Sequence, residues 1–158
     1  MNAKQPPGAE RLDNLSEPIV SASARVAEGN PATFAPGREF DAIITVKIQD
    51  GWHIYANPAG LAEMKPATLG LGSQAQRAVS LVQVSYPAGD AKLLGSVGTE
   101  KVALYETKVE LTVRLKISEQ AKPGAVAVPL KLSYQACNDR VCQAPAQLEM
   151  LLTVTVGQ

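Results

Sequence analysis

The chain has 158 residues, which is enough for one ordinary domain, and a domain of this size buries roughly 70% of the surface that its unfolded chain exposes. A disulfide is therefore not required for folding. Lysine plus arginine number 15 and aspartate plus glutamate number 15, so the net charge is zero and no basic field attracts phosphates. This balance argues against a nucleic-acid partner.

The amino-terminal stretch has the composition of a linker. Residues 1–10 lack the apolar run of a secretory signal, and Gln5-Pro6-Pro7-Gly8 is typical of a flexible connection. No apolar run in the chain approaches the roughly 18 to 20 residues that a membrane-spanning helix requires. We therefore expect residues 1–17 to form a flexible leader and residues 18–158 to form one soluble domain.

From residue 38 onward, apolar residues recur with a period of two, the spacing of a strand with one buried face. The two clearest runs are residues 38–49 and 108–117. Their apolar phases are Phe40, Ala42, Ile44, Val46 and Ile48 in the first, and Val109, Leu111, Val113, Leu115 and Ile117 in the second. Charges of alternating sign on the other face of the second run indicate a solvated surface rather than a binding patch.

Further strands are expected at residues 19–27, 51–56, 67–71, 79–86, 101–106, 126–136 and 147–156, with Gly and Pro in most of the gaps. Helix signals are nearly absent. Many short strands separated by such turns predict an all-β fold, with two antiparallel sheets packed face to face as an immunoglobulin-like sandwich.

Cys137 and Cys142 are the only cysteines and lie at a predicted turn between the last two long strands. Four intervening residues make a loop short enough for the sulfurs to meet, provided that the backbone brings the Cα atoms within about 7 Å. Strand parity predicts that the Cys137 sulfur points away from the core. Pro145 and the turn interrupt the parity, so the direction of Cys142 stays open.

The spacing allows two interpretations of this pair, an inert staple or a reversible redox switch. Closing so small a loop stabilises a fold by roughly 2 kcal/mol, against more than about 4 kcal/mol for a bridge that spans most of a sandwich. The position of the pair therefore favours cysteines that are accessible to a partner over a disulfide that serves to stabilise the fold. A zinc site is less favoured, because two thiolates and one histidine supply at most three ligands. A thioredoxin-type centre is not indicated, because the chain has no Cys-x-x-Cys and no predicted helix to lower a thiol pKa.

Two motifs resemble those of a known family. They are Tyr-Gln-Ala-Cys-Asn-Asp-Arg-Val-Cys at residues 134–142, followed by Ala144-Pro145, and Asp-Gly-Trp-His-Ile-Tyr-Ala-Asn-Pro at residues 50–58. Together they are similar to the hallmarks of the N-terminal domain of the thiol:disulfide interchange protein DsbD, also called the disulfide bond corrector domain family. The resemblance covers about residues 35–156.

The resemblance implies an immunoglobulin-like domain in the periplasm of Gram-negative bacteria, soluble itself but attached to the membrane through the full-length protein. Such a domain takes electrons from a thioredoxin-like donor domain and passes them to periplasmic disulfide isomerases and cytochrome c maturation thiol proteins. The resemblance implies no cofactor and no metal, because the Cys137–Cys142 dithiol carries the electrons. It also implies that Cys142 bonds the partner and that Cys137 resolves this bond.

Two departures from the family pattern concern the surroundings of the cysteines. The best-known member has one more residue between its cysteines. It also shields them with a cap loop that carries an aromatic residue, whereas the matching stretch here, residues 90–99, contains no aromatic residue.

His53 and Tyr55 are the other candidate site residues. In an extended strand they share one face, opposite Trp52 and Ile54, so one pair can pack into the core while the other lines a surface near the cysteines. His53 could tune the pKa of a neighbouring thiolate, although a lone strand histidine is more often simply hydrogen-bonded or exposed. Tyr55 could form a wall of the site or take part in ordinary cross-strand packing.

Three hypotheses about function follow. The first is a periplasmic electron-relay domain, a protein-disulfide reductase that works through Cys137 and Cys142. The second is a non-enzymatic binding or assembly module with a structural local disulfide. The third is a metal-carrying module that uses Cys137, Cys142 and His53.

Overall fold

The computed structural model describes residues 18–60, 64–72, 78–93 and 101–157. Within these ranges the chain forms eleven strands and no helix, so the prediction of an all-β fold is confirmed. The same ranges contain no helix of the length and apolarity that crossing a membrane demands. The leader expected at residues 1–17 lies outside the described residues.

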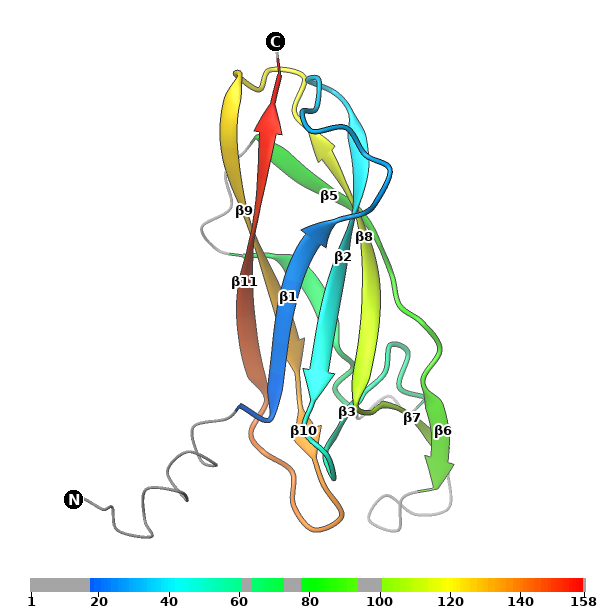
Figure 1. The fold of residues 1–158 in the computed structure, drawn as a ribbon. Helices are drawn as coiled ribbons and strands as arrows, with labels where there is room; N and C mark the ends of the chain where they lie inside the picture. The colour runs from blue at the N-terminus through cyan, green and yellow to red at the C-terminus, as the bar shows by residue number, and fades with distance from the viewer. Residues whose placement is uncertain (1–17, 61–63, 73–77, 94–100, 158) are drawn as a thin grey trace, which may run out of the picture.

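Two larger antiparallel sheets pack face to face as an immunoglobulin-like sandwich (Figure 1). One has the order β1-β2-β8-β5, in which the strands are Val20–Val26, Glu39–Ile48, Lys108–Ile117 and Val79–Ser85. The other has the order β11-β9-β4, with strands Ala146–Val156, Gly124–Tyr134 and Thr68–Leu71. The strands expected from the period-two pattern are therefore present, with ends that shift by one or two residues in most cases.

The core lies between these two sheets and is built from one face of each long strand. In β2 the side chains of Phe40, Ala42, Ile44, Val46 and Ile48 are at most 4% exposed, and in β8 Leu111, Val113, Leu115 and Ile117 are fully buried. Alternate residues of β9 and β11 cover them from the facing sheet. Each large aliphatic side chain buried in this way contributes about 1.5–3 kcal/mol to folding, so the core does not depend on a disulfide.

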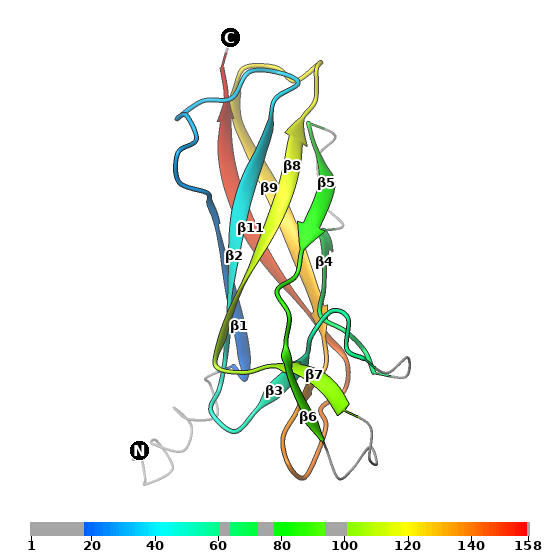
Figure 2. The same cartoon turned by 90° about the vertical axis from the view of Figure 1, so that its right-hand side faces the viewer.

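A third, smaller sheet lies at one end of the sandwich, at the bottom of Figures 1 and 2. Its order is β10-β3-β7-β6, with strands Ala136–Cys137, His53–Tyr55, Lys101–Tyr105 and Asp90–Leu93. Strands of two to five residues are too short to show a clear alternation of apolar and polar residues. For this reason the sequence did not predict β6 and did not separate β10 from β9.

Gly89, directly before β6, packs closely against the backbone of β7 and the side chain of Ala56. A Cβ atom at this position would lie 2.5 Å from the Cβ of Ala56 and 2.8 Å from the carbonyl oxygen of Leu104. No larger residue fits there without a shift of the backbone of β7. The chain therefore approaches β7 just before β6 as closely as only glycine allows.

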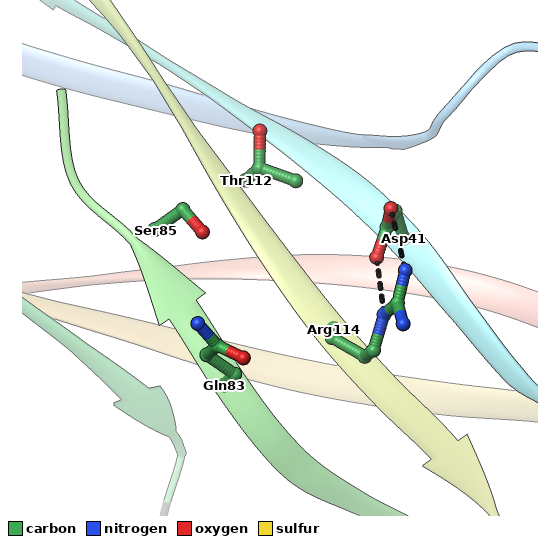
Figure 3. Close-up of a pocket in the computed structure, with 5 residues that line it drawn as sticks. All are labelled: Asp41, Gln83, Ser85, Thr112 and Arg114. Atoms are coloured by element: carbon green, nitrogen blue, oxygen red, sulfur yellow. Dashed lines mark hydrogen bonds and ion pairs between the residues drawn. The ribbon is translucent and has the colours of Figure 1, made fainter.

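The outward face of the β1-β2-β8-β5 sheet is polar, as the charge pattern of residues 108–116 predicts. Arg114 donates two hydrogen bonds to the carboxylate of Asp41, from Nε to Oδ1 at 2.9 Å and from Nη2 to Oδ2 at 3.3 Å. The two residues are register partners in the β2–β8 ladder. With Gln83, Ser85 and Thr112 they line a surface hollow (Figure 3), which contains neither a cysteine nor a histidine.

Candidate functional site

Cys137 and Cys142 form a disulfide across a tight hairpin, with an Sγ–Sγ distance of 2.07 Å and a Cα–Cα distance of 4.0 Å. They are partners in an antiparallel bridge. On one side of this bridge Asn138 N donates to Val141 O at 2.8 Å, and on the other Gln143 N donates to Ala136 O at 2.8 Å. The cysteines thus occupy the narrow, non-hydrogen-bonded position of an antiparallel ladder, where opposite side chains come closest.

The tip of the hairpin is organised by the side chain of Asn138. Its Oδ1 accepts hydrogen bonds from the backbone N–H groups of Arg140 and Val141, each at 2.8 Å, in the manner of an Asx turn. Asp139 and Arg140, at the tip between the cysteines, are exposed to solvent. Bonds other than the disulfide therefore also hold the two cysteines together. Sequence reasoning did not single out Asn138, although an Asn at the start of a short loop is a known turn signal.

The two cysteines differ sharply in exposure. Cys137 is 2% exposed and packs in a small apolar cluster with Tyr55, Ala59, Val102, Leu104 and the half-buried Met64. Cys142 is exposed, and its neighbour Val141 is 52% exposed. One sulfur of the disulfide thus belongs to a covered site and the other to the surface.

The parity prediction for Cys137 holds for the sandwich core, because its neighbour Ala136 packs there and Cys137 does not. The direction away from the core nevertheless does not expose Cys137 to solvent. The reason is the third sheet, in which β3 and β7 cover the side of β10 that faces away from the sandwich core.

β3 brings both further candidate residues to Cys137. His53 is the register partner of Cys137 in the β10–β3 ladder, and the Tyr55 hydroxyl lies 3.5 Å from the Cys137 Sγ. Ile54, on the opposite face, is fully buried in the sandwich core, and Trp52 packs against that core as well. The prediction that the two pairs face opposite sides is confirmed. The roles of His53 and Tyr55 stay predictions.

Burial sets the electrostatics of this face. It lowers the pKa of His53 below the usual 6.5, partly opposed by the carboxylates of Glu106 and Asp139, while the Lys92 ammonium adds to the lowering. Burial also raises the pKa of Tyr55. At neutral pH His53 is therefore an uncharged imidazole and Tyr55 an uncharged phenol that is able to donate a hydrogen bond.

A metal site does not form in the part of the chain that the structure describes, because no three His, Cys, Asp or Glu side chains gather there as a possible ligand set. The sulfurs of Cys137 and Cys142 are bonded to each other. The arrangement of the described residues is that of a disulfide site.

An apolar surface lies beside the stem of the hairpin, on the face of Ala136 and not on the face of the two sulfurs. A hollow next to the hairpin stem is lined by Ile19, Tyr134, Ala136, Gln143, Ala144, Pro145 and Ala146. Across the stem, Gln135 Nε2 donates to Gln143 O at 3.1 Å. The residues that follow Cys142 in sequence thus form one wall of this hollow and are fixed to the start of β10.

The sequence matches the family described as "Thiol:disulfide interchange protein DsbD, N-terminal" over residues 23–153. The chain belongs to this family. As a DsbD N-terminal domain it is a domain of thiol–disulfide exchange, and the disulfide hairpin described above is its only pair of cysteines. No curated protein sequence matches the chain.

The chain is similar to solved structures of other proteins. The N-terminal periplasmic domain of ScsB from Proteus mirabilis has a TM-score of 0.50 and 14% identity, over 87% of this chain and 45% of that chain. The full-length major pilin SpaD from Corynebacterium diphtheriae has a TM-score of 0.48 and 10% identity, over 86% of this chain and 34% of that chain. The chain thus spans less than half of the ScsB chain. At 14% identity the likeness to the ScsB domain shows the fold alone.

The stretch that corresponds to the cap loop of DsbD N-terminal domains is described only in part. Residues 90–93 form β6, which pairs with β7 beside the Cys137 cluster. Residues 94–99 lie outside the described residues. Shielding of the disulfide by this loop stays a prediction from the resemblance.

Proposed function

We propose that this domain relays electrons in the periplasm through the Cys137–Cys142 dithiol and disulfide. It accepts electrons from a thioredoxin-like donor domain and reduces disulfides of periplasmic proteins, among them disulfide isomerases and cytochrome c maturation thiol proteins. The observation that carries this proposal is the unequal exposure of two bonded sulfurs, Cys142 at the surface and Cys137 covered.

Electron delivery begins at the exposed cysteine. The Cys142 thiolate attacks one sulfur of the partner disulfide, a new Cys142–partner bond forms, and the second partner sulfur leaves with the electron pair. Cys137 then attacks the Cys142 sulfur and loses its proton. The Cys137–Cys142 bond forms, the partner's remaining sulfur leaves as a thiolate, and the partner is reduced by two electrons.

Electron uptake runs through the same atoms in reverse. A donor thiolate attacks Cys142 of the disulfide, because this sulfur is the accessible one, and Cys137 is the leaving group. The 3.5 Å contact of Tyr55 with the Cys137 sulfur supplies a hydroxyl that can stabilise the departing thiolate. Any partner that reaches Cys142 lies against its exposed neighbour Val141.

The surroundings of the disulfide support exchange rather than a structural staple. The bridge spans five positions in the sequence, and so small a loop contributes only about 2 kcal/mol to stability. The hairpin is also closed by backbone hydrogen bonds and by Asn138. A dithiol at this place therefore stays preorganised after reduction, which is the requirement for a reversible carrier.

Trapping of the mixed disulfide tests the proposal. Cys137→Ser removes the resolving thiol, so mixing this variant with an oxidised periplasmic partner is expected to give a cross-linked heterodimer that dithiothreitol dissolves. Cys142→Ser is the matched control and is expected to give little or no cross-link, because its remaining cysteine is covered. A domain that forms no heterodimer and whose disulfide has a reduction potential below about −300 mV is a structural-disulfide module, and the relay is then wrong.

A further inference from the structure

His53 is a buried histidine with an unused ring nitrogen. Its side chain is 5% exposed, and Nε2 has no hydrogen-bond partner in the part of the chain that the structure describes. Buried polar atoms in folded proteins are nearly always paired, so an exception calls for a physical explanation. His53 is also the single histidine of the chain.

The group directly opposite His53 is Cys137. The two residues are cross-strand partners, and such partners carry their side chains on the same face of a sheet with Cβ atoms about 4.5–5.5 Å apart. The Tyr55 ring stands edge-on to the His53 ring, with 6.0 Å between centroids, and its hydroxyl contacts the Cys137 sulfur. One imidazole, one phenol and one sulfur thus share the covered face of the small sheet.

The charged groups that act on His53 come from the neighbouring segments. They are Glu106 after β7, Asp139 in the hairpin tip and Lys92 on β6. None of them is hydrogen-bonded to Nε2. In the oxidised protein Cys137 has no proton to donate, because its sulfur is bonded to Cys142.

We propose that His53 is the proton acceptor for Cys137 when Cys137 resolves the mixed disulfide between Cys142 and a partner. This proposal rests on the relay function and adds to it a route for the proton. In the reduced domain the Cys137 S–H donates a hydrogen bond to His53 Nε2. In the resolving step that proton moves to Nε2 as the sulfur attacks.

The step is balanced in atoms and electrons. The Cys137 S–H bond breaks, and its proton passes to Nε2. The sulfur electron pair forms the bond to Cys142, and the Cys142–partner bond breaks, with its electron pair leaving on the partner's sulfur. The products are the intramolecular disulfide, a partner thiolate and a His53 imidazolium, which returns its proton to solvent or to the departing thiolate. The reverse sequence protonates Cys137 when a donor opens the disulfide.

A base is needed at this position because only the thiolate is a good nucleophile. A thiol titrates near 8.5 in water and holds its proton more tightly in apolar surroundings, and Cys137 lies in an apolar cluster. A positioned general base typically accelerates such a step by about 10²–10⁴-fold. His53 is suited to the task at neutral pH because its lowered pKa keeps the imidazole uncharged there.

Stopped-flow reaction of the reduced 158-residue chain with Ellman's reagent separates the two cysteines. In the first phase the exposed Cys142 attacks the reagent and releases one chromophoric thiolate. In the second phase Cys137 attacks the resulting mixed disulfide and releases another. The rate of the second phase in the wild type is expected to have a plateau at neutral pH and to fall as the pH decreases through the pKa of His53, which burial holds below 6.5.

His53→Gln keeps a polar side chain of similar length that takes up no proton at these pH values. It is expected to slow the second phase at least about tenfold at pH 7, and to make its rate climb with pH to beyond pH 8 as Cys137 ionises unaided. The first phase is expected to stay within about twofold of the wild type. His53→Phe, which keeps an aromatic ring, is expected to show the same selective loss, and it provides the readout if His53→Gln does not fold.

Tyr105→Phe is the matched control, because it removes an aromatic hydroxyl from β7 that faces Pro87 rather than the cysteines. It is expected to leave both phases unchanged. A second phase in both His53 variants within twofold of the wild type, with the same pH profile, overturns the proposal. So does an equal slowing of both phases, which indicates a purely structural role. A wild type that releases no second thiolate contradicts the relay function itself, and the two failures are thus distinguishable.

Discussion

Cys137 and Cys142 stand directly opposite each other, with their Cα atoms 4.0 Å apart, yet Cys137 is 2% exposed and Cys142 lies open to solvent. The backbone of the hairpin places the two sulfurs together, and the third sheet covers only one of them. An incoming thiolate can therefore reach only the Cys142 sulfur of this disulfide. This asymmetry leads to the first prediction.

In the reduced folded protein, Cys142 is expected to react with iodoacetamide at least about tenfold faster than Cys137, because the reagent must reach the sulfur and the sulfur must be ionised. Mass spectrometry of the modified peptide after short reaction times measures the two rates. In denaturant the rates are expected to become similar, which controls for sequence effects on the thiols. Equal rates in the folded protein contradict the asymmetry.

Loss of the disulfide is expected to leave the domain folded. A bridge that closes so short a loop contributes roughly 2 kcal/mol, and for a chain of this size about 1 kcal/mol changes Tm by roughly 2–4 °C. The double variant Cys137→Ser, Cys142→Ser is therefore expected to melt roughly 4–8 °C below the oxidised wild type, as calorimetry would measure. The reduced wild type is the control and should melt near the double variant. Unfolding of the double variant at room temperature is the contrary result.

Much of the fold follows from local patterns in the sequence. The long strands alternate cleanly because each has one face in the sandwich core and one in water, so period two predicts β2 and β8 and their buried residues. The opposite placement of His53 and Ile54 follows from the same rule. These features depend only on neighbours in the sequence.

The cover over Cys137 could not be predicted in the same way. Tyr55, whose hydroxyl touches the Cys137 sulfur, is 82 residues away in the sequence, and Val102 and Leu104 come from yet another strand. Parity indicates which side of a strand a residue occupies, but not what other segment lies on that side. The short strands of the third sheet carry too few residues for a periodic signal. The close approach of Gly89 to Ala56 and Leu104 also cannot be seen in the sequence, because it joins distant segments of the chain.

Asn138→Ala is expected to loosen the hairpin without unfolding the domain. Its Oδ1 accepts two backbone hydrogen bonds in the loop between the cysteines, and their loss at an exposed turn costs about 1 kcal/mol. A looser loop brings the thiols together less often, so the disulfide form loses stability relative to the dithiol. The reduction potential is then expected to rise by about 20 mV, since 30 mV corresponds to about 1.4 kcal/mol.

Equilibration with a glutathione redox buffer measures this potential for Asn138→Ala. Asn30→Ala is the matched control, because Asn30 also makes a side-chain hydrogen bond within a loop, to Ala27 O at 2.8 Å, but away from the cysteines. It is expected to lose a similar amount of stability and to keep the wild-type potential. An unchanged potential in Asn138→Ala contradicts the preorganisation argument.

The single histidine allows a direct measurement of its pKa by NMR. Burial is expected to hold the pKa of His53 below 6.5 in the oxidised protein, and Asp139→Asn is expected to lower it further, because the Asp139 carboxylate raises it. Glu149→Gln changes an exposed carboxylate on β11 and is expected to have no effect. A pKa of His53 at or above 6.5 contradicts the burial of the ring.

The same shift makes stability depend on pH. Between the lowered folded pKa and the unfolded value of about 6.5, the unfolded chain binds a proton that the folded chain does not. The free energy of unfolding is therefore expected to fall as pH decreases through this window and to receive no contribution from His53 above it. Urea titrations at a series of pH values measure this, and His53→Gln is expected to remove that part of the slope.

Gly89→Ala tests whether the small sheet is needed to cover Cys137. The new Cβ would lie 2.5 Å from Ala56 Cβ and 2.8 Å from Leu104 O, and overpacking of this kind typically costs about 1–3 kcal/mol. Because two of the three nearest atoms belong to the Leu104 backbone of β7, the strain is expected to displace β6 and β7 from the hairpin and to leave the two larger sheets intact. Cys137 of the reduced variant is then expected to react with iodoacetamide faster than in the wild type, and the ratio of the Cys142 rate to the Cys137 rate is expected to shrink.

Gly70→Ala is the matched control, because Gly70 lies in β4 with no atom within 4 Å of the added Cβ. It is expected to change the melting temperature by no more than a few degrees and to leave the ratio of rates unchanged. A Gly89→Ala protein that melts at a lower temperature but keeps Cys137 as protected as in the wild type would mean that cover over this sulfur does not depend on the position of the small sheet.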